Sequence, residues 1–151
     1  MIDQIMAVME AAFDPAWGEA WNRRQLSDAL ALPHTHAILI DASGSIVDNQ
    51  DTRVAAGFVL SRHAADEEEL LLIAVRPEHR NLGLGEKLIR QLVLNARKRN
   101  VAKIFLEMRQ NNPAAHLYRK IGFEPIGRRQ NYYLLADGSR MDAITFGFSI
   151  S

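Results

Sequence analysis

Hydrophobic and polar positions follow a helical spacing at the start of the chain. The apolar residues there recur every three or four positions, as on one face of an amphipathic helix: Ile2, Ile5, Met6, Met9 and Phe13. Residues 14–18 interrupt this spacing. Asn22 and Gln25 then stand as an N-cap residue and its reciprocal partner, which predicts a second helix ending before Pro33. We therefore expect two helices before the first strand.

The pattern then changes to short apolar runs rich in branched and aromatic residues, which predict strands. These runs cover residues 36–41, 54–61, 70–75, 103–108, 129–135 and 143–150. Turns are expected at residues 41–45 and 136–139, and a bend at the acidic residues 66–69.

Two further helices are expected between the later strands. One apolar face of the first contains Leu84, Leu88, Leu92 and Ala96, and this helix should end near Asn100. The second covers residues 113–121, with Pro113 in its first turn and Gly122 as its C-terminal cap. The order of elements predicts one α/β (α+β) domain over residues 1–151, with a mixed central β-sheet flanked by helices.

A loop with two glycines joins the strand at residues 70–75 to the long helix. Gly83 and Gly85 stand at the helix start, and Arg76 and Arg80 flank them with positive charge. Glycine allows backbone N–H groups to turn around phosphate oxygens, because no Cβ blocks their approach. The helix start adds unpaired N–H groups and the positive end of its dipole. The sequence therefore predicts a pyrophosphate site.

Two common pyrophosphate motifs do not fit this loop. The dinucleotide fingerprint needs a third glycine after Gly85, and the nucleoside-triphosphate loop needs Gly-Lys followed by Ser or Thr, whereas Gly85 precedes Glu86 and Lys87. The sequence R-N-L-G-L-G at residues 80–85 instead resembles the R-x-x-G-x-G signature of the GNAT acetyltransferases. This resemblance implies the GNAT acyl-CoA N-acyltransferase fold and a loop that holds the pyrophosphate of acetyl-coenzyme A.

The second half of the chain resembles the same family. L-E-M-R at residues 106–109 leads through an Asn-containing turn to L-Y at 117–118 and G-F at 122–123, and R-R-Q-N-Y-Y follows at 128–133. This combination resembles the bacterial ribosomal-protein-alanine N-acetyltransferases within the GNAT family. In that family the strand before the glycine loop splays from its neighbour, which implies a backbone N–H near Val75 for the thioester carbonyl.

The resemblance implies a role for each matching residue. Glu107 is the expected base, acting through water, and Tyr118 is expected to protonate the departing thiolate, since a phenol has a pKa of about 10 and a thiol about 8.5. The residues expected to bind acetyl-coenzyme A are Ile73, Ala74, Val75, Arg80, Asn81, Leu82, Gly83, Leu84, Gly85, Glu86, Asn111, Asn112, Ala114 and Tyr118. Those expected to bind the acceptor are Trp21, Glu107, Arg109, Tyr132 and Tyr133.

The spacing between Glu107 and Tyr118 departs from the subfamily by one residue. An Asn usually lies five residues after the Glu and seven before the Tyr, but here the two are eleven apart. Either Asn111 keeps the spacing to Tyr118, or Asn112 keeps the spacing to Glu107. We favour Asn111, because a loop tolerates a deletion better than a helix whose face would rotate by about 100°.

Composition narrows the possible partners. Eighteen basic residues balance eighteen acidic ones, which argues against direct nucleic-acid binding. The absence of cysteine excludes a thiol nucleophile and a thiolate metal site, and the five histidines lack metal-ligand spacing, so no metal is expected. The N-terminal residues do not resemble a signal peptide, and no apolar run has membrane length. We expect a cytoplasmic monomer or weak dimer without membrane contact.

The sequence thus predicts an acetyl-coenzyme A-dependent N-acetyltransferase acting on a protein N-terminal α-amino group. The subfamily resemblance implies the N-terminal alanine of a small-subunit ribosomal protein as the acceptor. Two alternatives stay open: an acetyltransferase for a small-molecule amine or lysine, and a non-catalytic acyl-CoA-sensing domain. The role of residues 46–53 also stays open.

Overall fold

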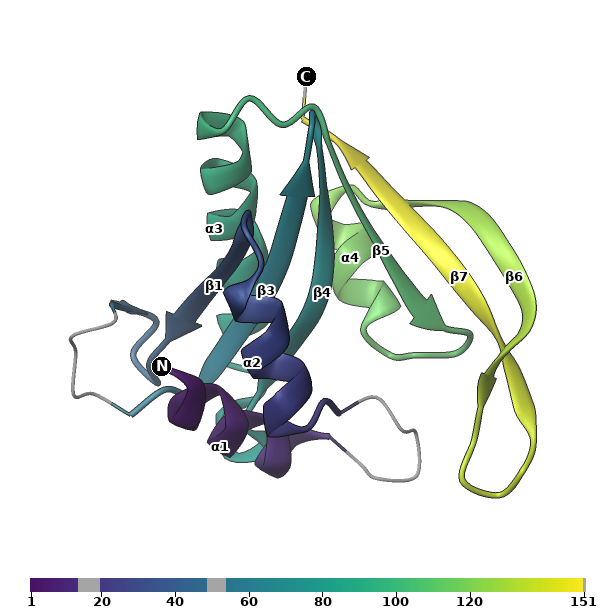
Figure 1. The fold of residues 1–151 in the computed structure, drawn as a ribbon, viewed down its shortest axis with the longest axis horizontal. Coiled ribbons are helices and arrows are strands. Elements are labelled where there is room, and N and C mark those ends of the chain that lie inside the picture. The colour runs from purple at the N-terminus through teal and green to yellow at the C-terminus, as the bar shows by residue number, and fades with distance from the viewer. Residues whose placement is uncertain (14–19, 49–53, 151) are drawn as a thin grey trace.

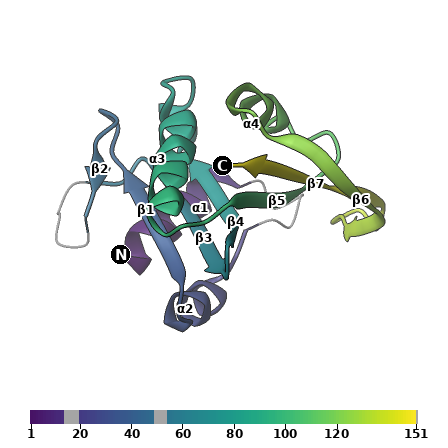
Figure 2. The ribbon, with the colours of Figure 1, turned by 90° about the horizontal axis from the view of Figure 1, so that it is seen from above.

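A computed structural model describes residues 1–13, 20–48 and 54–150 of the chain. Within these residues, seven strands form one mixed sheet in the order β2-β1-β3-β4-β5-β7-β6, with helices on both faces (Figures 1 and 2). The elements are α1 (Ile2–Ala12), α2 (Arg23–Ala31), β1 (Thr35–Ile40), β2 (Ile46–Val47), β3 (Gly57–Ala64), β4 (Glu67–Val75), the 3₁₀ turn η2 (Pro77–His79), α3 (Leu84–Lys98), β5 (Lys103–Arg109), α4 (Ala115–Ile121), β6 (Glu124–Leu134) and β7 (Arg140–Ser149).

The sheet separates two hydrophobic cores. α1 and α2 cover one face, where Ile5, Met9 and Leu26 pack with Phe58 of β3. α3 and α4 lie on the other face (Figure 2), and the apolar stripe of α3 packs against β1, β3 and β4. Burial of these apolar stripes is the main favourable term that holds the helices on the sheet.

The predicted fold class and the four predicted helices are confirmed. The side chain of Asn22 accepts a hydrogen bond from the Gln25 backbone N–H at 2.8 Å, and the Gln25 side chain accepts one from the Asn22 N–H at 2.9 Å, so both halves of the capping box form. Gly122 caps α4 with a φ of +122°. The predicted break at residues 14–18 lies outside the described residues.

Several predicted element boundaries are wrong. β3 begins at Gly57 rather than residue 54, α4 begins at Ala115 rather than 113, and β6 begins at Glu124 rather than 129. The acidic residues 67–69 belong to β4 and not to a bend, because the chain turns earlier, at Ala65 with a φ of +53°. The two-residue strand β2, which pairs with β1, was not predicted, since it is too short to show alternation.

β4 and β5 are parallel neighbours that pair at one end. Residues 67–69 pair with residues 103–105, after which β4 continues along β3 and β5 continues along β7. The two strands diverge from this paired end in Figure 1. The pairing of β3 with β4 also shifts register between Leu60 and Ser61, where a bulge bends the sheet. This confirms the splayed strand that the family resemblance implied.

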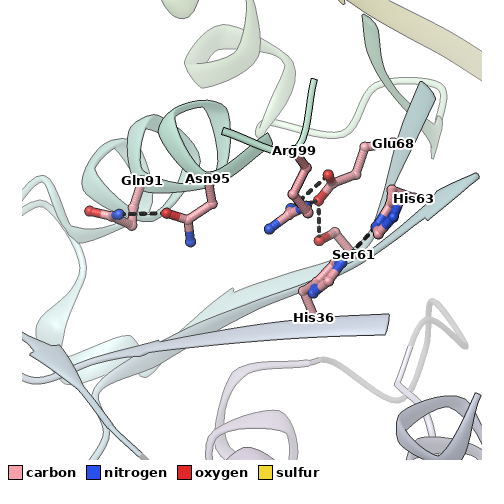
Figure 3. A network of polar contacts seen from close by, with 7 residues as sticks. All are labelled: His36, Ser61, His63, Glu68, Gln91, Asn95 and Arg99. Carbon is pink, nitrogen blue, oxygen red and sulfur yellow. Dashed lines mark hydrogen bonds and ion pairs between the residues drawn. The ribbon is translucent and has the colours of Figure 1, made fainter. Parts of the chain in front are cut away.

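A buried polar network holds the paired end of these strands under the C-terminus of α3 (Figure 3). The carboxylate of the fully buried Glu68 accepts hydrogen bonds from the Ser61 hydroxyl and from the Arg99 guanidinium, both at 2.6 Å. Beside it, the rings of His36 and His63 stack and share a hydrogen bond of 2.7 Å. Because the carboxylate is both ion-paired and hydrogen-bonded, its burial is compensated.

Candidate active site

A cavity of about 740 Å³ lies between the separated parts of β4 and β5. Its wall combines the end of α1, residues 70–75 of β4, residues 106–109 of β5, the glycine loop with the first turn of α3, and α4. The predicted site residues on this wall are Ile73, Ala74, Val75, Arg80, Asn81, Gly83, Leu84, Gly85, Glu86, Glu107, Arg109, Asn112, Ala114 and Tyr118. The splay thus brings both halves of the predicted site to one cavity.

Gly83 and Gly85 serve the glycine loop in different ways. Gly83 is the N-cap of α3 with a φ of +77°, a left-handed conformation that favours glycine, and an added Cβ would meet no described atom within 4 Å. An added Cβ at Gly85 would lie 3.1 Å from Leu117 Cδ2, so this glycine lets α4 approach α3. No described side chain caps α3, whose first N–H groups therefore keep their capacity to bind an anion.

Arg80 fastens the loop to two other elements. Its guanidinium donates to the carbonyl oxygen of Ala12 at the end of α1, at 2.9 Å, and to that of Val75 at the end of β4, at 3.3 Å. Ala12 and Val75 both line the cavity. The position of the loop is therefore coupled to the ends of α1 and β4.

Glu86 and Lys120 join α3 to α4 beside the cavity. Lys120 Nζ lies 2.9 Å from Glu86 Oε1, and Arg90 Nε lies 3.1 Å from Glu86 Oε2. The hydrogen bond from Lys120, followed by that from Arg90, lowers the pKa of Glu86. The Lys120 and Arg90 side chains are exposed to solvent and that of Glu86 is half-buried, so the ion pairs contribute little to stability.

Glu107 stands on the cavity wall at the middle of β5. Its Oε2 lies 3.1 Å from Arg129 Nε of β6 and accepts a long hydrogen bond of 3.4 Å from the Thr145 hydroxyl of β7. These partners come from the two strands on the far side of β5 and hold the carboxylate from that side. The opposite side of Glu107 faces the gap left by β4.

Tyr118 and Asn112 reach the same wall from the segment after β5. Tyr118 is 3 % exposed and packs edge-on against Phe123, with ring centroids 5.6 Å apart. Asn112 lines the cavity and its side chain accepts a hydrogen bond from the Ala114 N–H at 3.0 Å. Asn111, which we favoured from spacing, is exposed with a φ of +67° and lies off this wall. The left-handed turn at Asn111 directs Asn112 inward.

Four other predicted residues also lie off the wall. Leu82 is 56 % exposed. Trp21 packs against the core under α1 and α2, and its backbone N–H contacts Met9 Sδ at 3.0 Å. Tyr132 and Tyr133 form an edge-on pair on β6 with centroids 5.3 Å apart. The roles of Trp21 and the two tyrosines in acceptor binding stay predictions.

Sequence reasoning missed a number of residues on the wall. They are Ala12, Phe13, Leu70, Leu71, Leu72, His79, Leu106, Met108, Pro113, Leu117 and Lys120. Helical spacing from Ala114 and Tyr118 could have identified Leu117, because residues three or four apart share a helix face. Ala12 and Phe13 resemble, with Trp21, an aromatic motif of the subfamily, but the sequence did not place them at the cavity, which they reach only through tertiary packing of α1.

The described residues do not contain a helix long and apolar enough to cross a membrane. Nor do the described histidine, aspartate and glutamate side chains gather in a group of three that could hold a metal ion.

Comparison with known proteins identifies relatives of this chain. The acetyltransferase (GNAT) domain family matches residues 36–125. The ribosomal protein bS18-alanine N-acetyltransferase of Escherichia coli K12 is 41 % identical over 97 residues, which cover 64 % of this chain and 65 % of that enzyme. A Bacillus subtilis protein, named provisionally for the same activity, is 30 % identical over 133 residues, or 87 % of this chain and 80 % of that protein. The aligned part thus spans just under two thirds of the E. coli relative.

A solved structure extends the similarity over the whole fold. The crystal structure of the ribosomal-protein-S18-alanine N-acetyltransferase from E. coli superposes with a TM-score of 0.80 at 29 % identity. The superposition covers 99 % of this chain and 88 % of that one. It therefore includes α1, α2 and the β6–β7 hairpin, which lie partly or wholly outside the family match.

Proposed function

The chain belongs to the GNAT acetyltransferase family, and on this premise we propose that it transfers the acetyl group of acetyl-coenzyme A to a protein N-terminal α-amino group. The acceptor we propose is the N-terminal alanine of a small-subunit ribosomal protein, as the names of the two relatives suggest. The observation that carries the proposal is the cavity between β4 and β5, whose wall includes the glycine loop, Glu107 and Tyr118.

The donor end of the cavity has the chemistry that a pyrophosphate needs. The uncapped first turn of α3 offers N–H groups and the positive end of a helix dipole, and Arg80 adds a guanidinium. Gly83, in a left-handed conformation, lets the loop turn into the first turn of α3. Bound acetyl-coenzyme A supplies an activated acyl group as a thioester.

The acceptor end has the chemistry that an α-amine needs. Such an amine has a pKa of about 8, against about 10.4 for lysine, so roughly a tenth of it is neutral at pH 7. Glu107 would accept the remaining proton on a carboxylate oxygen, directly or through water. Tyr118 of α4, which also lines the cavity, would donate its Oη proton to the departing sulfur. The carboxylate therefore has only a modest deprotonation to assist.

The proposal is tested with peptide acceptors and mass spectrometry. A peptide beginning Ala-Arg should be acetylated on its α-amine at least about tenfold faster than the same peptide with a blocked terminus and a free lysine, because the lysine amine is far less often neutral. Faster reaction of the lysine would overturn the acceptor class. Binding of acetyl-coenzyme A without transfer to any amine would favour the acyl-CoA-sensing alternative.

The proposed acceptor also suggests where the enzyme works and what it contacts. A ribosomal protein as acceptor implies action in the cytoplasm. The balance of eighteen basic and eighteen acidic residues supports contact with a protein terminus rather than directly with nucleic acid. We expect a monomer or weak dimer.

A further inference from the structure

Four charged side chains form a row across the sheet at the point where β4 and β5 begin to separate. Arg62 of β3 and Glu69 of β4 are cross-strand partners, and Glu69 pairs with Phe105 of β5. Glu107 lies two residues after Phe105 and so points to the same face of the sheet. Arg129 of β6 completes the row through its 3.1 Å ion pair with Glu107. We call these four residues the charge row.

The charge row lies on the face opposite α3. Glu68 turns toward α3, where it binds Arg99 (Figure 3), so its neighbour Glu69 turns to the other face, which carries α1 and α2. Glu69 is the last residue of β4 that pairs with β5, and residues 70–75, which follow it, line the cavity. Glu69 therefore stands where the two strands begin to separate, next to the first residue that lines the cavity and not itself among the lining residues.

The two carboxylates in the middle of the row interact. Burial is the largest cause that raises the pKa of Glu69, and the negative charge of Glu107 raises it further. The guanidinium groups of Arg62 and Arg129 oppose this rise. These are the charged groups that shift the pKa of Glu69, and a further cation, Arg109, lies two residues after Glu107 on β5 and lines the cavity.

The charges of the row differ in whether they are already paired. Arg129 neutralises Glu107 in their ion pair, and the Arg62 guanidinium donates from its Nε to Thr35 Oγ1 of β1 at 3.3 Å, on the side away from the cavity. A neutral Arg129–Glu107 pair attracts a cation weakly. An α-amine, however, arrives about nine-tenths protonated at pH 7, as an ammonium ion. Among the described residues, Glu107 is held in an ion pair whereas Glu69 is not, so the charge of Glu69 is the one that the row leaves to attract this ammonium ion, against the opposing charges of Arg62 and of Arg109 on the cavity wall.

We propose that Glu69 is a positioning residue of the acceptor site, whose carboxylate draws the cationic amine of the acceptor to Glu107. This inference rests on the proposed function, because it takes an amine to be the acceptor that approaches Glu107. The proton of that ammonium passes to Glu107, and Glu69 forms and breaks no bond in the transfer.

The test compares the steady-state kinetics of the parent enzyme and Glu69→Gln with an Ala-Arg peptide. The substitution removes the charge and keeps the shape, so the KM for the peptide should rise about five- to thirtyfold at pH 7, while kcat changes less than about threefold. Glu69→Asp, which keeps the charge, should restore most of the loss. Glu67→Gln is the matched control, since it removes an equal charge from an exposed position two residues farther from the cavity.

The pH dependence separates electrostatic attraction from a packing defect. As pH rises from 7 to about 9.5 the α-amine loses its charge, so the ratio of KM between Glu69→Gln and the parent should fall toward one. A defect in packing would persist at every pH. Calorimetry with coenzyme A should give equal affinities for the parent and the variant, which reports that the donor end is intact.

Three results overturn the inference. An unchanged peptide KM in an active Glu69→Gln enzyme, or a KM increase that does not depend on pH, contradicts the role of Glu69 and leaves the proposed function standing. A parent enzyme that acetylates no amine contradicts the proposed function, and the role of Glu69 with it.

Discussion

The single side chain of Tyr118 both packs in the core and lines the cavity. Its ring is held edge-on against Phe123 in the core around α4, while part of the residue lines the cavity. A buried ring has little rotational freedom, so its hydroxyl is held in a fixed place before any ligand arrives. Preorganisation of this kind is what a proton donor to a departing group requires.

Tyr118→Phe therefore isolates the hydroxyl from the ring. The variant keeps the contact with Phe123, so the fold and the affinity for coenzyme A should change little, while kcat should fall by about 10²-fold, as for a positioned proton donor. Stopped-time assays with the Ala-Arg peptide measure kcat, and calorimetry measures donor affinity. Ser45→Ala, which removes an exposed hydroxyl between β1 and β2, away from the cavity, should keep the parent kcat. Equal rates for Tyr118→Phe and the parent would assign Tyr118 to packing alone.

The sequence could predict the position of a site residue where that residue belongs to a short motif, and could not where the position depends on tertiary structure. Gly83, Glu107 and Tyr118 belong to motifs with fixed spacing, and all three lie on one cavity wall. Asn111 was favoured over Asn112 from its spacing to Tyr118, but spacing does not show that Asn111 adopts a left-handed conformation and that Asn112 is the one that lines the cavity. Glu69 carried no motif, because its position depends on the register between β4 and β5.

At the scale of elements, the network around Glu68 joins α3, β1, β3 and β4 at the paired end of the splay (Figure 3). At this end β4 and β5 pair through their backbones and the ion pair holds β4 to the end of α3, while the other ends of β4 and β5 separate around the cavity. The same elements show the limits of pattern reading. The sequence predicts that β4 begins only at Leu70, because three consecutive glutamates are typical of solvent-exposed positions. Glu68 is instead fully buried against Arg99. β6 is an edge strand exposed along most of its length, so alternation could not define its start.

The histidines of this network should make the stability of the fold depend on pH. Burial, followed by the charge of Arg99, lowers the pKa of His36 below its usual value of about 6.5, with His63 and His34 acting in the same direction and Glu68 opposing them. The unfolded chain therefore binds more protons than the fold between the lowered pKa and about 6.5. The contribution of neutral His36 to the free energy of unfolding is complete above that pH range and is lost as the pH falls through it.

Thermal unfolding at pH 7 and pH 5 measures this effect. The parent should lose more stability than His36→Gln over the same interval, since glutamine cannot gain a proton there. His116→Gln, on an exposed position of α4, controls for the loss of a histidine outside the network and should behave like the parent. An identical pH dependence in the parent and His36→Gln would contradict the prediction.

For the whole molecule, the cavity joins segments that are far apart in the chain. Its wall runs from Ala12 at the end of α1 to Lys120 in α4, and Arg80 ties the glycine loop to α1 across this distance. A ligand that binds this wall contacts only the folded chain, because unfolding separates these segments. Its binding free energy must therefore add to the free energy of unfolding.

Coenzyme A should accordingly raise the melting temperature, and the glycine loop should control the size of the rise. At a hundredfold excess over Kd the gain is about 2.7 kcal/mol, or about 5–10 °C for a chain of this length. Gly83→Val should lose most of this shift, because a side chain at a φ of +77° forces the loop away from its position at the start of α3. Gly138→Val is the matched control: Gly138 has a φ of +87° and open space around it, but it lies in the turn between β6 and β7. Both variants should melt earlier than the parent without ligand, since both positions strain a valine. A full coenzyme A shift in Gly83→Val, or its loss in both variants alike, would contradict the assignment of the pyrophosphate to the glycine loop.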